Sequence, residues 1–184
     1  MTIQEKYKLK GSLNISGDKS ISHRSVIMAA MSIGKTEIHN LLESKDILST
    51  INILRKLGVK IKKDNEVWIV NGVGTCGFKQ PKQNLDSGNS GTTSRLMFGA
   101  VATNPICATF TGDKSLCSRP MSRVTDLLED IGAKVELTKN NYLPLSIEGT
   151  QNSLPKKHVI NKPSAQIKSC IMLAALNING QTSI

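Results

Sequence analysis

The sequence is poor in aromatic side chains, with one Trp, two Tyr and three Phe among 184 residues. Its core must therefore be built mainly from aliphatic side chains. The four cysteines form no CxxC pair and have no zinc-type spacing with the three histidines, which favours reduced thiols over a disulfide framework or a zinc site. No apolar run reaches the length of a membrane span, and the N-terminal segment MTIQEKYKLK lacks the apolar centre of a signal peptide, so we expect a cytoplasmic protein.

Acidic residues are also few, since 14 Asp and Glu stand against 24 Lys and Arg, for a net charge of +10. The lysines are scattered and no aromatic residues are interleaved among them to stack on bases, so a nucleic-acid partner is disfavoured. A basic protein can instead attract small polyanionic substrates into a cleft. The remaining composition, 39% hydrophobic and 21% charged, is ordinary for one globular domain.

Three times a short polar stretch leads directly into an unusually apolar segment: Gly17 to Met31, Asp86 to Ala102, and Lys162 to Leu176. Aligned on their small residues, Ala30 matches Ala100 and Ala175. A second pattern recurs as well, ILRKLGVKI from Ile53 against LLEDIGAKV from Leu127, and its third copy would begin beyond Ile184. The sequence therefore predicts two complete repeats and part of a third.

Each repeat is expected to have the order β-α-β-α-β-β. In the first, a helix from Ser20 to Ser32 ends before Gly34, and Ser44 caps a second helix from Lys45 to Leu57, which Gly58 ends. Its predicted strands are Leu13 to Ser16, Thr36 to Leu42, Val59 to Lys63 and Val67 to Val70. The second repeat is predicted to contain a helix from Thr92 to Ala102, a helix opened by Pro120, and strands Ala108 to Thr111, Lys134 to Leu137 and Leu145 to Ile147. The third supplies a strand, its helix and a strand start at Gln181 to Ile184.

The first helix of each repeat is apolar nearly all round, whereas the second helices are amphipathic. We therefore expect an α/β fold in which three core helices lie side by side, with the amphipathic helices and the sheets outside. If the core helices run parallel, their N-termini gather unpaired N–H groups and positive partial charge on one face, which suits an anionic ligand. The residues at these starts are Lys19, Ser20, Arg24, Asn89, Gly91, Thr92, Ser164 and Gln166.

A purely structural explanation competes with this anion site. Ser20, Asn89 and Ser164 are good N-cap residues with or without a ligand, and the glycines can serve turns or close packing. Lys19 and Arg24 favour the ligand, because cations beside a helix N-terminus cost stability unless an anion offsets them. The stretch GDKS at Gly17 is not a Walker A loop, and its recurrence at Gly112 is off the repeat spacing.

Four motifs occur in a specific order: GDKSISHR from Gly17, LDSGNSGTTSRL from Leu85, TGDKSLCSRPM from Thr111 and KPSAQIKS from Lys162. Together they resemble the EPSP synthase (3-phosphoshikimate 1-carboxyvinyltransferase) family over essentially the whole chain, which would be about the first half of a member. The resemblance implies the enolpyruvyl transferase fold, one domain of an inside-out α/β barrel made of three β-α-β-α-β-β units. It also implies that residues 1–13 cross to a second domain that is missing here, and that residues 14–184 form the substrate-binding domain of the N-terminal half.

The activity that the resemblance implies is the transfer of the enolpyruvyl group of phosphoenolpyruvate to the 5-hydroxyl of shikimate 3-phosphate, in the shikimate pathway to chorismate and the aromatic amino acids. It uses no metal or organic cofactor. The acid–base carboxylates of the family belong to the missing half, so this chain alone is expected to be inactive. The family's phosphoenolpyruvate pocket is also where glyphosate binds.

The resemblance also implies roles for individual residues, which are assigned by matching the family's motifs to positions in this sequence. Lys19 is expected to contact both substrates and to be catalytic. Shikimate 3-phosphate would be bound by Lys19, Ser20, Arg24, Ser164, Ala165 and Gln166. Phosphoenolpyruvate would be bound by Lys19, Asn89, Gly91, Thr92, Arg119 and Gln166. Cys117 is interpreted as incidental, and Leu96 is a departure, since some members carry proline there.

Two alternatives remain open at the level of sequence. One is a free-standing domain that binds phosphate ligands without catalysis. The other is a relative of the UDP-N-acetylglucosamine enolpyruvyl transferases, against which the GDKSISHR and PSAQ motifs argue.

Overall fold

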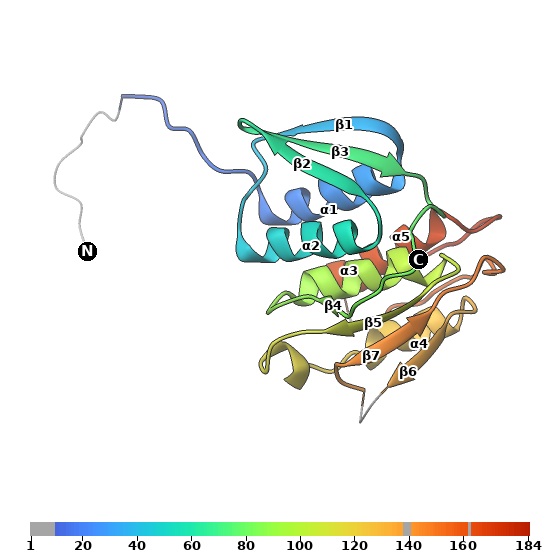
Figure 1. The fold of residues 1–184 in the computed structure, drawn as a ribbon. Coiled ribbons are helices and arrows are strands. Elements are labelled where there is room, and N and C mark those ends of the chain that lie inside the picture. The colour runs from blue at the N-terminus through green and yellow to red at the C-terminus, as the bar shows by residue number, and fades with distance from the viewer. Residues whose placement is uncertain (1–9, 138–140, 162) are drawn as a thin grey trace, which may run out of the picture.

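The first repeat forms a three-stranded antiparallel sheet and two helices in the computed structural model, which describes residues 10–137, 141–161 and 163–184. Its elements in chain order are α1 (Lys19–Met31), β1 (Ile33–His39), α2 (Lys45–Lys56), β2 (Lys60–Asp64) and β3 (Val67–Val73). The strand order is β1-β3-β2, and Val70 of the central strand lies opposite Thr36 and Ile61. The sheet lies against α1 and α2 (Figure 1).

The second repeat has the predicted order β-α-β-α-β-β. Its elements are β4 (Leu85–Asp86), α3 (Gly91–Ala102), β5 (Cys107–Thr111), the 3-10 turn η1 (Leu116–Ser118), α4 (Ser122–Glu129), β6 (Lys134–Leu137) and β7 (Leu145–Glu148). The sheet order is β4-β5-β7-β6, with β4 parallel to β5 and the other pairs antiparallel. The third repeat contributes α5 (Ala165–Ala175).

The predicted first strand, Leu13 to Ser16, is wrong. Residues 10–18 form no strand, and Leu13 and Ile15 are strongly exposed. Before the cap residue Asp18, the only side-chain hydrogen bond to this segment among the described residues joins Asn40 Nδ2 to the carbonyl of Ile15 at 3.3 Å. A strand needs a run of backbone partners, and the segment has none. Residues 1–9, which carry most of the predicted crossing segment, lie outside the described residues.

Several predicted element ends shift. Gly34 does not end α1 but lies inside β1, because Ser32 already takes an extended conformation after Met31. Pro120 precedes α4 by two residues instead of opening its first turn. The predicted strand at Gln181 to Ile184 is only an isolated bridge between Lys157 and Ser183, since no neighbouring strand extends it.

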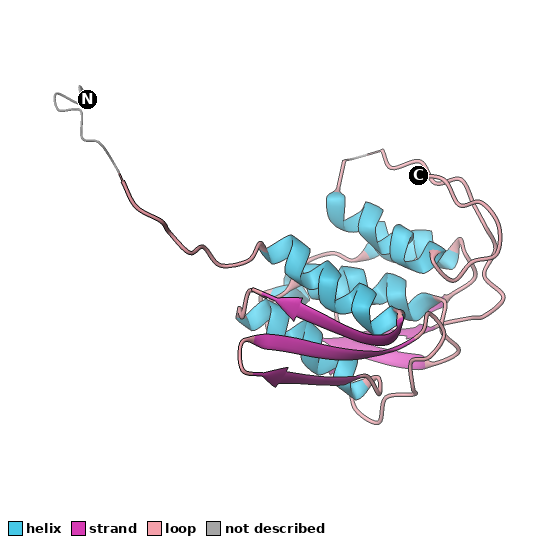
Figure 2. Cartoon of the chain, turned by 90° about the horizontal axis from the view of Figure 1, so that it is seen from above, coloured by secondary structure: helices cyan, strands magenta, loops and turns pink. Residues whose placement is uncertain are grey.

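The core helices are buried to different degrees. α3 lies in the centre between the two sheets (Figures 1 and 2), and every residue from Leu96 to Ala102 is buried. It approaches α5 so closely at Gly99 that a Cβ there would lie 2.0 Å from the carbonyl oxygen of Cys170. By contrast, α1 exposes Ile21 and Met28, and α5 exposes Met172, with the exposed Leu176 directly after its end. The prediction of three interior helices is therefore correct for α3 and only partly correct for α1 and α5.

Candidate anion-binding site at the helix starts

Contacts between side chains bring the starts of four helices together. Gln166 of α5 donates from Nε2 to Thr92 Oγ1 of α3 at 3.0 Å. Thr93 of α3 donates to the carbonyl of Asp46 at the start of α2 at 3.1 Å, and the Asp46 carboxylate forms an ion pair with Lys19 of α1. Figure 1 shows α1, α2 and α3 beginning on the same side of the molecule. Their N-terminal dipoles therefore add on one face. The sequence predicted such a gathering for the first helix of each repeat, α1, α3 and α5, and the start of α2 joins it.

The N-caps differ in part from those predicted. Asp18 caps α1 by accepting from the N–H of Ile21 at 2.8 Å, and Ser90 caps α3 by accepting from the N–H of Thr93 at 3.1 Å. Ser164 caps α5 as predicted, with a bond of 3.3 Å. The capping explanation for Ser20 and Asn89 is thus wrong, because Asp18, two residues before Ser20, and Ser90, directly after Asn89, take the caps and leave these side chains available for other contacts.

The two cations of α1 have different partners. Lys19 is half exposed and pairs with Asp46, so the chain itself supplies a carboxylate beside this helix start. Arg24 donates to the carbonyl of Ser20 at 3.0 Å and to Ser169 Oγ of α5 at 2.5 Å, which are neutral groups. The argument that both cations lack an anion therefore holds for Arg24 and not for Lys19.

Arg95 is a cation that the sequence analysis left without a role. It lies one turn into α3 and donates from Nη1 to Gln166 Oε1 at 3.0 Å and to the carbonyl of Gly91 at 3.3 Å. Burial is the main cause that lowers its pKa, followed by the positive charges of Arg119 and Arg123. A guanidinium that is half-buried beside two others, with neutral partners only, is placed to bind an anion.

Arg119 is held over the start of α3 from the loop after β5. It donates to Asn89 Oδ1 at 2.7 Å and to Ser115 Oγ at 3.1 Å. Asn89 in turn donates to Asp113 Oδ2 at 2.6 Å, and the backbone N–H of Leu116 together with Asn89 lowers the pKa of Asp113. The second GDKS stretch, Gly112 to Ser115, is therefore a supporting loop that fixes Asn89 and Arg119.

Gly91 opens α3 directly beneath these guanidinium groups. A Cβ at this position would lie 2.5 Å from Nη1 of Arg95 and 3.6 Å from Nη1 of Arg119. The glycine thus leaves room for the cations that surround the helix start. By motif Gly91 was assigned to phosphoenolpyruvate, and the structure identifies Arg95 and Arg119 as its neighbours.

A buried hydroxyl network supports the site from below. His23, one turn after Lys19, contacts Thr50 Oγ1 through Nδ1 at 2.8 Å, and Thr50 contacts Thr93 at 2.9 Å. Thr93 Oγ1 also lies within hydrogen-bonding distance, 2.8 Å, of Oγ of the cap residue Ser90. Burial is the largest cause that lowers the pKa of His23 to about 4, so its imidazole is neutral at pH 7. The network links α1, α2 and α3.

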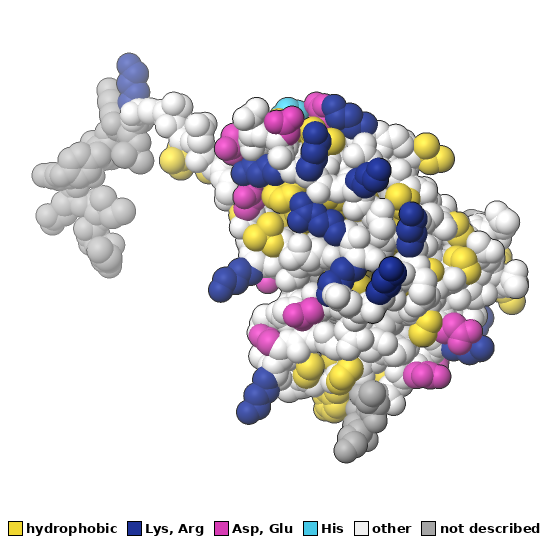
Figure 3. Space-filling model, in the orientation of Figure 1, with side chains coloured by type: hydrophobic (Ala, Val, Ile, Leu, Met, Phe, Trp, Pro, Cys, Tyr) yellow, Lys and Arg dark blue, Asp and Glu magenta, His cyan; other side chains and the backbone are white. Residues whose placement is uncertain are grey.

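Other site chemistries find no support in the described ranges. No group of three or more His, Cys, Asp and Glu residues there could hold a metal ion. The four cysteines are free thiols, and Cys117 donates to the carbonyl of Gly112 at 3.3 Å without contacting the cations. Within the part of the chain that the structure describes, no helix has the length and apolarity to cross a membrane. On the face seen in Figure 3, Lys and Arg spread from the first sheet across α2 and α3, with Asp and Glu among them.

The family assignment follows from comparison with known proteins. The model of the family described as EPSP synthase (3-phosphoshikimate 1-carboxyvinyltransferase) matches residues 3–184. The chain belongs to the EPSP synthase family. It is 46% identical over 177 residues to a 3-phosphoshikimate 1-carboxyvinyltransferase of Novosphingobium aromaticivorans, covering 96% of this chain and 40% of the relative. A relative of the same description from Bradyrhizobium is 49% identical over 178 residues, with the same coverage.

Solved EPSP synthases confirm the fold. The 2.37 Å structure of EPSP synthase from Acinetobacter baumannii superposes with a TM-score of 0.89 at 38% identity, covering 94% of this chain and 39% of that one. The predicted enolpyruvyl transferase fold is therefore correct. The chain spans about 40% of the length of the EPSP synthases that it matches.

Proposed function

We propose that this chain forms the substrate-binding part of a cytoplasmic EPSP synthase, which transfers the enolpyruvyl group of phosphoenolpyruvate to the 5-hydroxyl of shikimate 3-phosphate. The observation that carries the proposal is the gathering of Arg24, Arg95 and Arg119 at three parallel helix starts with neutral partners only. Both substrates are polyanions, and fixed cations offset their charge and hold them in reacting geometry.

The proposed contacts for shikimate 3-phosphate lie between α1 and α5. Arg24 bridges the two helices through Ser169, and the Ser164 cap with Ala165 and Gln166 opens α5. The phosphate would accept from the N–H groups at the α5 start and from the guanidinium of Arg24. Lys19 and Ser20, at the start of α1, would complete this side.

The proposed contacts for phosphoenolpyruvate lie at the α3 start. Gly91 and Thr92 open the helix, Arg119 stands above it on Asn89, and Gln166 reaches it from α5. Lys19, half exposed and paired with Asp46, would exchange this carboxylate for the substrates and act in catalysis. The remaining part of the enzyme, including the domain that residues 1–13 would reach, would supply the carboxylates that move protons to the methylene carbon and from the 5-hydroxyl.

Titration of the 184-residue chain by calorimetry tests the binding. We expect weak but specific affinity for shikimate 3-phosphate and much weaker affinity for shikimate, because an open half-site leaves charge pairs screened by water. Arg24→Gln should weaken shikimate 3-phosphate binding about tenfold, the cost of roughly one charge-assisted hydrogen bond pair. Lys60→Gln, which removes one exposed charge on β2, is the matched control and should have little effect. Equal response to shikimate with and without its phosphate would refute the site.

An assay of phosphate release separates the enzyme from the alternative of a binding domain. The 184-residue chain alone should release no phosphate from the two substrates, while a full-length EPSP synthase carrying this segment should turn over. A full-length chain that binds both substrates and does not turn over would favour the binding domain.

A further inference from the structure

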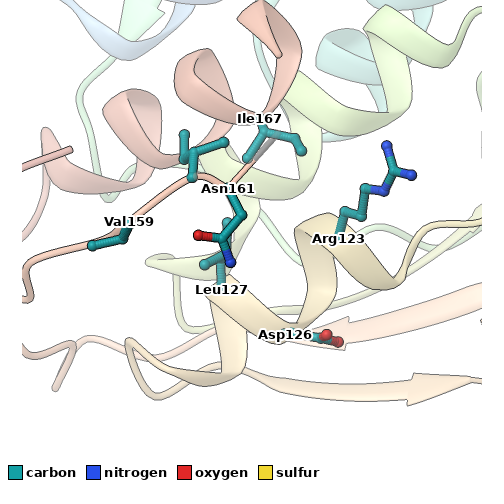
Figure 4. A pocket seen from close by; sticks show the side chains of 7 residues that line it. Arg123, Asp126, Leu127, Val159, Asn161 and Ile167 are labelled. Carbon is teal, nitrogen blue, oxygen red and sulfur yellow. The ribbon is translucent and has the colours of Figure 1, made fainter. Parts of the chain in front are cut away.

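Arg123 is a fourth cation near the α3 and α5 starts, and neither the motifs nor the proposed contacts use it. It is the second residue of α4, which packs against α5. Its side chain lines a cavity with Leu127 and Ile167, and there it points away from Asp126 of its own helix (Figure 4). Arg123 also lines an adjoining polar cavity of about 250 Å³, together with Arg95, Pro120, Ser164 and Gln166.

The charge around Arg123 is uncompensated. Neither Arg123 nor Arg95 forms an ion pair with any carboxylate of the described residues. Arg95 already binds Gln166 and lies within the positive field of Arg123. Two guanidinium groups facing one cavity repel each other, and this cost persists until an anion enters.

The cavity also offers neutral donors of the kind that bind oxyanions. Ser164 caps α5, whose first N–H groups open at this side, and the Gln166 amide bridges to α3 through Thr92. Guanidinium groups match the planar or tetrahedral oxygens of carboxylate and phosphate, since they donate through two N–H groups at once.

We propose that Arg123 is an additional ligand-binding residue, which together with Arg95 holds an oxyanion group, phosphate or carboxylate, in the polar cavity between α4 and α5. The inference rests on the proposed function, because it extends the same anion site from the α3 start toward α4. Arg123 lies outside all four sequence motifs, two residues after the SRPM end of the third motif at Met121.

Arg123→Gln tests the proposal in the 184-residue chain, with Lys60→Gln as the charge-matched control and Arg123→Lys as the conservative variant. Each protein is titrated with inorganic phosphate, phosphoenolpyruvate and pyruvate, and its thermal midpoint is recorded with and without ligand. Pyruvate carries only a carboxylate and inorganic phosphate only a phosphate, so the two arms show which group Arg123 holds.

We expect Arg123→Gln to weaken the binding of phosphoenolpyruvate three- to tenfold. It should also weaken, by the same factor, the binding of either inorganic phosphate or pyruvate, whichever carries the group that Arg123 holds. Lys60→Gln should change these affinities less than twofold. Arg123→Lys should restore part of the loss. The unliganded Arg123→Gln protein should also melt higher than Lys60→Gln, because repulsion of Arg95 is removed. A residue with a merely structural role would lower the midpoint and leave affinity unchanged.

Two other outcomes would overturn the proposal, and they distinguish its failure from a failure of the proposed function. If Arg119→Gln weakens phosphoenolpyruvate binding and Arg123→Gln does not, Arg123 binds no ligand and the proposed function stands. If the unmodified chain binds neither substrate nor inorganic phosphate, both proposals fail.

Discussion

The two ends of the central helix α3 use polar side chains in opposite ways. At its C-terminal end, Asn104 donates to the carbonyls of Ala100 at 2.7 Å and Thr75 at 2.9 Å, and accepts from the N–H of Phe78 at 3.3 Å. At its N-terminal end, Arg95 and Arg119 are charged and bind neutral groups. Asn104 therefore has partners matched to it, whereas neither cation forms an ion pair with a carboxylate of the described residues.

The contrast distinguishes polar side chains that stabilise the fold from polar side chains that are available to bind a ligand. A neutral network with its bonds made inside the chain contributes to folding and needs no further partner. Unpaired cations at a helix N-terminus oppose the dipole and cost stability, so their value must come from binding. Substitutions at the two ends should therefore affect stability and affinity separately.

The largest effect is expected at the C-terminal end. Asn104→Ala leaves two carbonyls and one N–H without this partner in a buried site, which should lower the free energy of unfolding by about 4 kcal/mol. Urea unfolding measures the loss, and Asn71→Ala, at an exposed asparagine on β3, is the control with an expected change under about 0.5 kcal/mol. The affinity of the folded fraction for phosphoenolpyruvate should not change. A variant that keeps its stability but loses affinity would reverse the comparison.

His23 does not fit this division between the two ends, because it lies below the cationic end of α3 but is buried and affects stability. Its pKa is lowered from 6.5 to about 4, mainly by burial; Lys19 and Arg24 lower it further, and Asp46 opposes them. Between these two pH values the unfolded chain binds a proton that the folded chain does not, so stability is present above pH 6.5 and falls as the pH drops toward 4. The loss should reach about 3 kcal/mol.

Urea unfolding of the unmodified chain and of His23→Asn from pH 7 to pH 4 measures this term. The asparagine does not titrate, and other acid-dependent terms are common to both proteins. The difference in stability between them should therefore shift by about 3 kcal/mol across the range. Parallel curves would show that the pKa of His23 is the same in the folded and the unfolded chain.

The sequence predicted most of the helical framework. α2 and α3 were located to within one residue at each end, because an amphipathic or apolar run follows a capping residue and ends at Gly58 or after Ala102. The gathering of helix starts could be predicted because the repeats force equivalent helices into equivalent places. Predictions based on local sequence or on repetition were thus the reliable ones.

The remainder depended on contacts between distant segments. Asp18 and Ser90 take the N-cap positions predicted for Ser20 and Asn89. Several neighbouring polar residues can cap a helix, and the backbone conformation determines which of them does. The strand at Leu13 to Ser16 failed for want of a partner strand. Arg95 and Arg123 are 28 residues apart, and the packing of α4 against α3 and α5 brings them to one cavity.

The next effect concerns affinity alone. Arg119→Gln should weaken phosphoenolpyruvate binding about tenfold, equal to roughly 1.4 kcal/mol, since it removes a guanidinium held over the α3 start. Stability should change by less than about 0.5 kcal/mol, because Arg119 is only partly buried and its exposed partners Asn89 and Ser115 can bind water instead. Calorimetry and urea unfolding measure the two quantities, with Lys60→Gln as control. A large loss of stability would show that Arg119, like Asn104, serves to stabilise the fold.

Gly91→Ala should give the smallest effect and the sharpest comparison, because it adds one methyl group below the cations. The new Cβ would lie 2.5 Å from Arg95 Nη1, the end of a flexible side chain, so the guanidinium should move off Gln166 while the helix remains intact. We expect a change in stability of less than about 1 kcal/mol, since alanine favours the helix and offsets the displacement. Phosphoenolpyruvate affinity should fall about threefold, which corresponds to roughly 0.7 kcal/mol.

Gly11→Ala is the matched control, because a Cβ at position 11 meets nothing within 4 Å. Repeating Gly91→Ala in an Arg95→Gln background should abolish most of its effect on affinity, since the group that the methyl displaces is already gone. If Gly91 serves only the turn into α3, alanine will lower stability and leave affinity unchanged in both backgrounds. That result would remove Gly91 from the ligand site and leave Thr92 and Arg95 as the contributions of α3 there.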